Sequence, residues 1–308
     1  MRLLFHTAGT NAESWLGALR REFPDAHIDL WPSALAGDAD YALVWKPPVD
    51  LLRALGRVEA VFNLGAGVDS VPDVSMLPRN ALLVRLEDAG MAEQMIEYVC
   101  HAVLHRYREF DAYAEQQQSA EWRQRPRLSK SEFTVGILGL GVLGTAVALA
   151  LAPFGFPLRG WSRTPKLLPG VATSAGGPEL DDFLAGVRVL VCLLPLTSRT
   201  QGLLDSARLS RLPRGAYVVN VSRGGLVVDD DLLALLDNEH LAGATLDVFR
   251  DEPLPREHRF WHHPRVTLTP HVSAVTLVEE SVAQIAAKIR CLEAGLPITG
   301  VVGREHGY

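Results

Sequence analysis

The sequence predicts an α/β protein built from two doubly wound parallel-sheet domains. Its 308 residues suggest two domains at about 150 residues each. Short segments that are apolar throughout alternate with helical patterns, which is typical of parallel strands covered on both faces. The first series of expected strands comprises residues 3–5, 28–31, 41–45, 60–64 and 82–86. The second series comprises residues 133–138, 158–162, 187–194, 216–221, 244–248 and 266–269.

Two longer segments have helical periodicity. The helix expected at 91–118 leads into a polar and basic connection. The helix expected at 277–294 has apolar residues at steps of four and three, and Gly295 and Pro297 end it. If both helices cross between the domains, the last residues rejoin the first domain. Alternatively, both helices cover the second sheet.

Composition excludes several classes of protein. The formal charge of −6 does not fit a nucleic-acid binder. No apolar run reaches the roughly 18 residues of a membrane span, and the first residues resemble a strand more than a signal peptide. The three cysteines are far apart and form no CxxC pair. We therefore expect a cytoplasmic protein with reduced thiols, no nucleic-acid or membrane partner and no metal.

A glycine-rich loop follows the strand expected at 133–138. Its six residues are Gly139, Leu140, Gly141, Val142, Leu143 and Gly144, and an apolar helix follows them. This strand–GxGxxG–helix context is the one that a dinucleotide site requires. The glycines permit a tight turn, a close approach to a pyrophosphate and close helix–strand packing. The motif predicts a Rossmann dinucleotide-binding domain.

The end of the next strand indicates which dinucleotide is preferred. An NAD-binding protein places an acidic residue about 20 positions after the glycines. Here Ser162, Arg163 and Lys166 occupy that region, and the next acid is Glu179. A hydroxyl and two cations suit a ribose 2′-phosphate, so the sequence favours NADP. The alternative is an exposed basic loop.

Three later segments each place one ionisable residue just after a strand. They carry Arg223, Glu252 and His271. The carboxyl ends of parallel strands face the ligand crevice in doubly wound sheets. There an Arg can hold a carboxylate and polarise a carbonyl, and a His can give or take a proton. A neighbouring Glu stabilises the protonated ring and fixes its orientation.

With these motifs, the sequence resembles the D-isomer-specific 2-hydroxyacid dehydrogenases over its whole length. The resemblance rests on GxGxxG followed by NxSRG at 220–224, LDVFxxEP at 246–253 and TPHxxA at 269–274. Within the family it is similar to bacterial reductases of glyoxylate and hydroxypyruvate. That closer similarity rests on YALVWKPP at 41–48, LGAGVDS at 64–70, EDAGMAEQM at 87–95, WSR at 161–163 and GY at 307–308.

The resemblance implies roles for individual residues. It implies Arg223 as the substrate-orienting residue, Glu252 as the partner of the catalytic histidine and His271 as the proton donor. It further implies that Asp247 contacts the nicotinamide end, that Leu194 and Pro195 line the adenine side, and that Val221 borders the cofactor.

A second glycine loop, with Gly65, Ala66 and Gly67, follows an apolar strand in the first domain and can form an anion-binding nest. By resemblance it holds the substrate carboxylate, while Trp45 and Arg85 border the pocket. The resemblance also implies a homodimer. It implies a flavodoxin-like substrate domain at 1–97 and 283–308 and a dinucleotide-binding domain at 98–282.

These observations predict an NADPH-dependent reductase of short 2-oxoacids such as glyoxylate and hydroxypyruvate, yielding glycolate and D-glycerate. One alternative is an NAD-linked dehydrogenase that acts on a larger acid. Another is a non-enzymatic NADP(H) sensor on the same fold, which loss of a catalytic residue would favour. All three catalytic residues are present.

Overall fold

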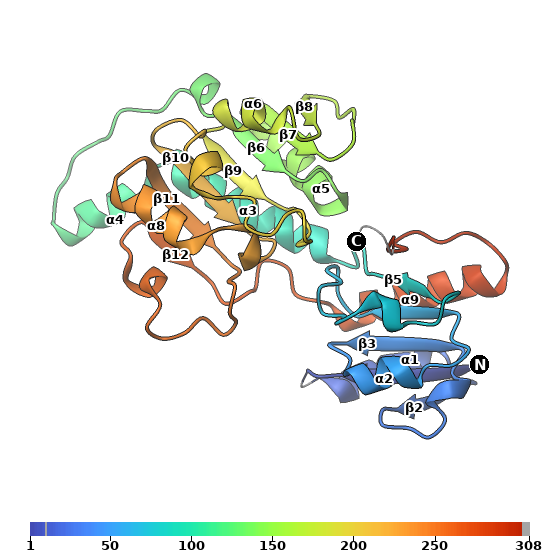
Figure 1. The fold of residues 1–308 in the computed structure, drawn as a ribbon. Helices are drawn as coiled ribbons and strands as arrows, with labels where there is room; N and C mark the ends of the chain where they lie inside the picture. Colours follow the sequence, from blue (N-terminus) through green and yellow to red (C-terminus); the bar gives the residue numbers. More distant parts are fainter. Residues whose placement is uncertain (10, 304–308) are drawn as a thin grey trace. The chain divides into compact units, whose positions relative to one another are not determined.

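The chain divides into two compact units in a computed structural model that describes residues 1–9 and 11–303. The first unit comprises Met1–Met91 and Thr276–Tyr308, and the second comprises Ala92–Val275 (Figure 1). The Gly-Tyr pair at 307–308, noted above for its resemblance, lies outside the described residues.

The first unit is built on a parallel sheet with the order β2-β1-β3-β4-β5. This is the flavodoxin-like strand order, in which the direction of strand addition switches between β1 and β3 while all strands stay parallel. The strands are β1 (Arg2–Thr7), β2 (His27–Leu30), β3 (Tyr41–Trp45), β4 (Ala60–Asn63) and β5 (Leu82–Val84). The helices of this unit are α1 (Ala12–Glu22), α2 (Val49–Ala54) and α9 (Val278–Glu293).

The C-terminal segment returns to the first sheet. Helix α9 packs against α1, where Arg21 pairs with Glu279 and Arg290 pairs with Glu22. After α9, Val302 donates its N–H to the carbonyl of Leu83 at 2.8 Å, and residues 300–302 run beside β5. An edge strand needs such cover because its backbone groups are otherwise unpaired.

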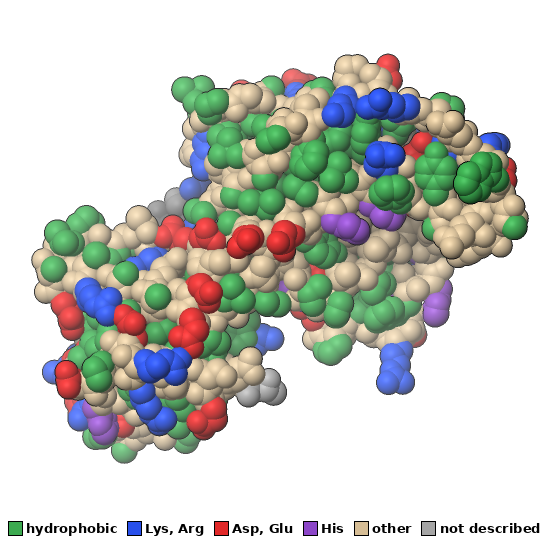
Figure 2. Space-filling model, turned by 180° about the vertical axis from the view of Figure 1, so that it is seen from behind, with side chains coloured by type: hydrophobic (Ala, Val, Ile, Leu, Met, Phe, Trp, Pro, Cys, Tyr) green, Lys and Arg blue, Asp and Glu red, His purple; other side chains and the backbone are tan. Residues whose placement is uncertain are grey.

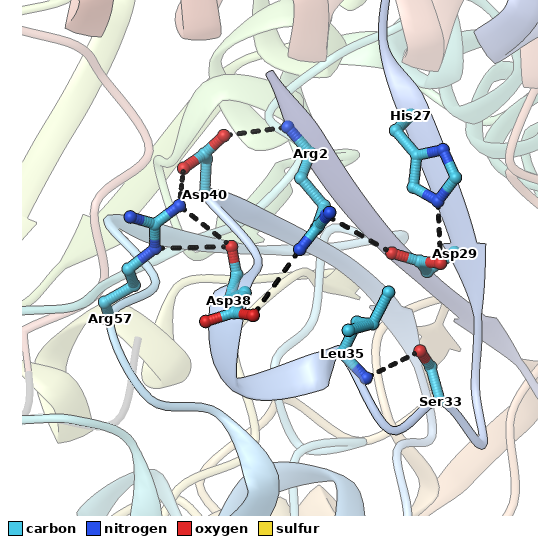
Figure 3. A network of polar contacts seen from close by, with 8 residues as sticks. All are labelled: Arg2, His27, Asp29, Ser33, Leu35, Asp38, Asp40 and Arg57. Atoms are coloured by element: carbon cyan, nitrogen blue, oxygen red, sulfur yellow. Dashed lines mark hydrogen bonds and ion pairs between the residues drawn. The ribbon is translucent and has the colours of Figure 1, made fainter.

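A polar network joins the amino ends of the first sheet (Figure 3). The backbone N–H of Arg2 donates to Asp40 at 2.7 Å, and Arg57 pairs with the same carboxylate at 3.1 Å. The Arg2 guanidinium lies 3.7 Å from Asp29, and His27 contacts Asp29 at 3.1 Å. These residues lie near the amino ends of the strands. The network therefore stabilises the edge of the sheet opposite the carboxyl ends of the strands.

The second unit holds a seven-stranded parallel sheet with the order β12-β11-β10-β9-β6-β7-β8. Its first six strands in the chain have the classic Rossmann order, and β12 extends it. The strands are β6 (Val135–Leu138), β7 (Leu158–Ser162), β8 (Val171–Ala175), β9 (Val189–Cys192), β10 (Ala216–Asn220), β11 (Leu241–Leu246) and β12 (Val266–Leu268). The helices are α3 (Met91–Tyr107), α4 (Phe110–Gln118), α5 (Val142–Leu151), α6 (Leu180–Ala185), α7 (Ser206–Leu209) and α8 (Asp229–Asp237).

Both faces of this sheet are buried. In β9, Val189 and Val191 enter a core with α3 and α5, whereas Leu190 and Cys192 enter a core with α6 and α8. Alternate residues of a strand point to opposite faces, so these two cores lie on the two sides of the sheet. A doubly wound architecture follows, as the sequence predicts.

The structure differs from two sequence-based expectations. The helix expected at 91–118 is broken between α3 and α4, where Glu109 adopts a left-handed conformation with φ of 53°. Strand β8 was not predicted from its sequence VATSA, because Thr and Ser interrupt its apolar residues and none of its residues is buried. An edge strand of this kind pairs on one side only and needs no apolar run.

No helix among residues 1–9 and 11–303 is long and apolar enough to cross a membrane. On the face seen in Figure 2, acidic and basic side chains are interspersed over the first unit. That face of the first unit therefore shows no basic stripe of the kind that nucleic-acid binders carry.

Candidate active site

The three glycines of the loop after β6 each meet a different steric demand. Gly139 has φ of +115°, and a Cβ there would lie 2.8 Å from the backbone of Leu193. A Cβ on Gly144 would lie 1.9 Å from the carbonyl oxygen of Gly139, so α5 packs directly on the loop. Gly141, the N-cap of α5, is exposed, and nothing lies within 4 Å of a Cβ built on it. The loop therefore has open space where a pyrophosphate would approach a helix N-terminus, and its residues fit a dinucleotide.

The segment after β7 lies beside this loop. Lys166 donates from its ammonium to the carbonyl of Leu140 within the glycine loop. Ser162 is buried and donates its hydroxyl to the carbonyl of Thr164 at 2.7 Å, while Arg163 is exposed. Glu179, the first acid after β7, accepts the N–H of Ala175 at 2.8 Å beyond β8. The charged side chains that directly follow β7 are therefore cationic, and Lys166 among them contacts the glycine loop.

Residues after β9 and β10 line the next part of the same edge. Leu194 is buried and Pro195 is half-buried. The hydroxyl of Ser222 donates to the carbonyl of Leu194, and the N–H of Val221 donates to Cys192 at 3.4 Å. These hydrogen bonds connect the segment after β9 with the segment after β10, next to the strand that precedes the glycine loop.

Arg223 is half-buried just after β10. Its Nη1 donates to the carbonyl of Ser222 at 2.7 Å, and the side chain of Asn220 holds the carbonyl of Arg223 at 3.0 Å. A Cβ on the next residue, Gly224, would lie 1.9 Å from the backbone of Phe249. Only glycine allows the Arg223 segment to lie this close to the loop that carries Glu252.

His271 and Glu252 form an ion pair across the ends of β12 and β11. His271 Nδ1 lies 2.8 Å from Glu252 Oε2, and Glu252 Oε1 accepts the N–H of Phe249 at 2.9 Å. Because an ionised carboxylate only accepts hydrogen bonds, Nδ1 carries the proton of this contact and Nε2 is left for another partner. About 41% of the His271 side chain and 36% of the Glu252 side chain is exposed, so a ligand can reach the pair.

The backbone of His271 is held in an uncommon conformation. Its φ is +56°, and its N–H donates to the carbonyls of Asp247 at 2.8 Å and Thr269 at 3.1 Å. Such left-handed conformations are sparsely populated outside glycine and persist where surrounding contacts hold them. The shorter of the two contacts comes from Asp247, which is buried at 0% exposure.

The catalytic and cofactor candidates lie in strand order along one edge. Because all seven strands are parallel, their carboxyl ends meet at one edge, where these residues follow β12, β11, β10, β9, β6 and β7 in turn. The proton-transfer pair lies at the β11–β12 end and the cationic segment follows β7. From β11 to β7 there are four strand spacings, about 19 Å in all. A long ligand lying along this edge would reach both ends.

The substrate-binding candidates belong to the first unit. A Cβ on Gly65 would lie 2.5 Å from the indole of Trp45, so glycine permits this ring to pack on the loop. Gly65 is buried, while Ala66 and Gly67 are half-buried. The side chain of Asn63 donates to the carbonyls of Gly65 at 3.0 Å and Gly67 at 2.8 Å. Asn63 thus shapes the proposed anion nest.

Arg85 follows β5 and is half-buried. Its N–H donates to the carbonyl of Gly300 at 2.9 Å, and Lys288 approaches its carbonyl at 3.3 Å. Lys288 also pairs with Glu87 at 3.2 Å. The C-terminal segment and α9 therefore hold the backbone of Arg85.

No group of three or more metal-ligating side chains occurs in the described part of the chain. His258 lies 3.6 Å from Asp229, and His263 lies 3.3 Å from Asp237. Two of the histidines in the 258–263 segment thus face carboxylates of α8.

A sheet edge arranged in this way is that of a dinucleotide-dependent dehydrogenase, and comparison with known proteins agrees. Residues 100–273 match the model of the NAD binding domain of the D-isomer specific 2-hydroxyacid dehydrogenases. The chain belongs to that family, which confirms the resemblance inferred from its motifs.

Individual relatives cover the whole chain. A glyoxylate/hydroxypyruvate reductase A of Serratia proteamaculans is 47% identical over 100% of both chains. A D-isomer specific 2-hydroxyacid dehydrogenase of Xanthobacter autotrophicus, solved with NADPH and MES, is 38% identical with a TM-score of 0.94 over 100% of this chain and 99% of that one. An NADPH-dependent glyoxylate/hydroxypyruvate reductase of Sinorhizobium meliloti, solved with NADP and sulfate, is 36% identical with a TM-score of 0.91 over the same shares.

Sequence reasoning missed two residues that shape the loops of the candidate site. Asn63 and Asn220 are buried polar residues at the ends of apolar strands, and each donates to at least one backbone carbonyl of the following loop. A lone Asn that ends an apolar strand is a usable signal, because a buried amide needs partners nearby.

Proposed function

We propose that this protein reduces short 2-oxoacids, above all glyoxylate and hydroxypyruvate, to glycolate and D-glycerate with NADPH. The observation that carries the proposal is the His271–Glu252 pair, which lies on the same sheet edge as Arg223 and the glycine loop. The relatives described above, with their named activities and bound NADPH or NADP, support the same substrate and cofactor.

The glycine loop and the segment after β7 would hold the cofactor. Gly139, Gly141, Val142, Leu143 and Gly144 shape the pyrophosphate site, and Ser162, Arg163 and Lys166 face the 2′-phosphate. Leu194, Pro195 and Val221 border the cofactor, and Asp247 contacts its nicotinamide end. When bound, the nicotinamide supplies the hydride that reduces C2 of the oxoacid.

The remaining chemistry belongs to the side chains of this protein. His271 donates the proton on Nε2 to the oxygen that becomes the hydroxyl, because Nδ1 is engaged by Glu252. Glu252 orients the ring and stabilises its protonated form. Arg223 presents a planar fork that holds the substrate carboxylate and stabilises charge growing on the carbonyl oxygen.

The first unit contributes substrate contacts in this proposal. Gly65, Ala66 and Gly67 bind the carboxylate through backbone N–H groups, while Trp45 and Arg85 border the pocket. A bulky indole near the substrate favours two- and three-carbon acids. On this assignment the first unit is the substrate domain, expected at 1–97 and 283–308, and the second is the dinucleotide-binding domain, expected at 98–282.

The protein acts as a cytoplasmic homodimer in this proposal. Its three cysteines are free thiols, which suits a reducing compartment. Trp122 is fully exposed in the connection that follows α4, and Phe110 in α4 is 48% exposed. Aromatic side chains are enriched where proteins associate, and a second copy is the partner that family resemblance implies.

A substrate and cofactor panel tests the proposal. Initial rates with glyoxylate, hydroxypyruvate and phenylpyruvate are measured with NADPH and with NADH. The expected order places hydroxypyruvate and glyoxylate far above phenylpyruvate, and NADPH above NADH. Faster turnover of phenylpyruvate would overturn the substrate assignment, and equal efficiency with NADH would overturn the cofactor assignment.

A further inference from the structure

A chain of hydroxyl groups connects helix α3 with Asp247. The phenol of Tyr98 lies 2.5 Å from Thr269 Oγ1. Thr269 Oγ1 in turn lies 2.5 Å from Asp247 Oδ1. Tyr98 belongs to α3, whereas Thr269 and Asp247 follow β12 and β11. The chain thus links a helix on one face of the sheet to its catalytic edge.

The direction of the protons in this chain follows from the chemistry of its groups. Asp247, as a carboxylate, can only accept, so Thr269 must donate its single hydroxyl proton to it. Thr269 then has only lone pairs to offer, and Tyr98 must donate to Thr269. Every proton therefore points toward the buried Asp247. Burial raises the pKa of Tyr98 to about 12, so the phenol keeps its proton at any pH used for an assay.

Asp247 transmits this arrangement to the histidine. Its carboxylate also accepts the N–H groups of Val272 and Ser273, both at 2.8 Å. Its backbone carbonyl accepts the N–H of His271 at 2.8 Å. One buried residue thus holds three successive residues of the turn in which His271 has a positive φ.

We infer that Tyr98 and Thr269 are positioning residues for the proton donor His271, acting through Asp247. The inference rests on the function proposed above, and neither residue needs to touch substrate or cofactor. Removing the Thr269 hydroxyl leaves Asp247 with one donor fewer, and removing the Tyr98 hydroxyl takes away the group that orients the Thr269 hydroxyl. In either case the turn loosens, and Nε2 of His271 loses its fixed direction. Small misplacements of a catalytic group are costly because proton transfer depends on geometry.

Thr269→Val and Thr269→Ser form the central pair of variants. Valine keeps the shape and removes the hydroxyl, and serine keeps the hydroxyl. Thr269→Val is expected to lower kcat by about 10- to 100-fold with little change in the KM of the oxoacid. Thr269→Ser is expected to restore most of kcat. Tyr98→Phe, which removes the outer donor only, is expected to lower kcat less than Thr269→Val.

A second tyrosine–threonine pair in the same sheet provides a matched control. The hydroxyl of Tyr217 lies 2.9 Å from Thr245 Oγ1, and both side chains are buried. Tyr217→Phe removes a buried tyrosine–threonine hydrogen bond, as Tyr98→Phe does. It is expected to lower the thermal midpoint by a similar amount and to leave kcat unchanged.

Hydrogen exchange provides a readout that needs no turnover. In the protein without substrate, amide protection across 269–275 should fall in Thr269→Val and Tyr98→Phe and stay at the wild-type level in Tyr217→Phe. Unchanged protection in both Thr269→Val and Tyr98→Phe would overturn the inference. A loss of kcat in Tyr217→Phe equal to that in Tyr98→Phe would also overturn it. If protection falls as expected but the wild-type protein turns over no 2-oxoacid, the proposed function fails while the positioning of the turn stands.

Discussion

At the scale of single residues, the proposed reaction depends on one imidazole, that of His271. Glu252 binds Nδ1 of His271 at 2.8 Å and is itself fixed by the N–H of Phe249 at 2.9 Å. The ring therefore has one orientation, and its Nε2 can give a proton in reduction or take one in oxidation. The hydrogen bond from Nδ1 to Glu252 should therefore decide how well the ring is placed for this transfer.

Glu252→Gln tests this role. The amide keeps the shape of the side chain and removes its charge, so the hydrogen bond to Nδ1 is weaker and the ring is less firmly oriented. The value of kcat/KM for the oxoacid should therefore fall by about 10- to 100-fold, while the affinity for NADPH stays nearly unchanged. Steady-state kinetics of the variant beside wild type provide the check, and an unchanged kcat/KM would remove Glu252 from the proposed mechanism.

The residues proposed to carry the chemistry could be selected from the sequence because they lie in short motifs. Arg223, Glu252 and His271 each follow a strand, and parallel strands bring their ends together. The supporting contacts were not predictable in the same way. Tyr98 contacts Thr269 across a sequence separation of 171 residues, so only the folded chain brings the two together. Asn63 bonds the carbonyls of Gly65 and Gly67 in the adjoining loop, and its contact was open to sequence reasoning that did not use it.

At the scale of elements, the position of each loop along the sheet edge sets its task. The segment after β7 carries its cations beside the glycine loop, with Lys166 bound to the carbonyl of Leu140. The first acid after β7, Glu179, caps the end of β8 instead. The segment after β7 therefore suits a cofactor whose ribose carries an additional negative charge.

Arg163→Ala tests the preference that this segment creates. A charge-assisted contact contributes on the order of 1.5–3 kcal/mol, so kcat/KM for NADPH should fall roughly 10- to 100-fold. The value for NADH should change little, because NADH lacks the phosphate. Arg211→Ala, which removes an exposed guanidinium 3.6 Å from Asp181, serves as the control and should leave both values unchanged. A parallel fall for the two cofactors would contradict the assignment.

The contact between α9 and the segment after β5 gives a prediction for stability. Glu87 pairs with Lys288 at 3.2 Å and accepts the hydroxyl of Thr299. Burial alone would raise the pKa of Glu87, but the hydrogen bond from Thr299 and the charge of Lys288 together lower it below 4.5. The stability that this carboxylate contributes is therefore present above pH 4.5 and is lost as the pH falls through the lowered pKa.

Glu87→Gln should accordingly destabilise the protein at neutral pH by about 1–3 kcal/mol. The difference from wild type should shrink in acid, where wild-type Glu87 is itself protonated. Thermal unfolding midpoints across the pH range provide the measurement. Glu121→Gln, which breaks the exposed pair with Arg123, is the control and should change the midpoint little at any pH. If the unfolding midpoint of Glu87→Gln stays below that of wild type by the same amount at acidic pH, the role assigned to this contact is contradicted.

Elements were predictable where their pattern is strong. Apolar runs identified the strands of both buried sheets, including β9 with all four residues buried. Strand β8 was missed because an edge strand with partly exposed residues carries no such run. The break between α3 and α4 was missed because a single left-handed residue, Glu109, is not one that sequence propensity favours there.

At the scale of the whole molecule, two parallel sheets divide the proposed tasks. The Rossmann-type unit holds the catalytic and cofactor candidates, and the flavodoxin-like unit holds the candidates for substrate binding. The parallel sheets of both units follow from alternating strands and helices, which the sequence predicts. The assignment of a task to each unit comes from its loops, because fold alone does not determine function.

The proposed dimer is a second property of the whole molecule. Trp122 has its entire side chain exposed in the described chain, in a segment otherwise rich in polar and basic residues. If a second copy covers this indole, Trp122→Glu should weaken association, because a charge would be buried without a partner. Sedimentation equilibrium over a range of concentrations is the measurement. Leu167→Glu, at another almost fully exposed apolar side chain, is the control. A wild-type protein that remains monomeric throughout would contradict the dimer.

The central claim is that His271 donates the proton while hydride is supplied by NADPH. The most direct test is kcat/KM for hydroxypyruvate in His271→Ala, with the affinity for NADPH measured on the same preparation by fluorescence titration. Loss of a general acid predicts a fall of about 10²- to 10⁴-fold with NADPH affinity nearly unchanged. Near-normal turnover in His271→Ala, with NADPH still bound, would contradict the account.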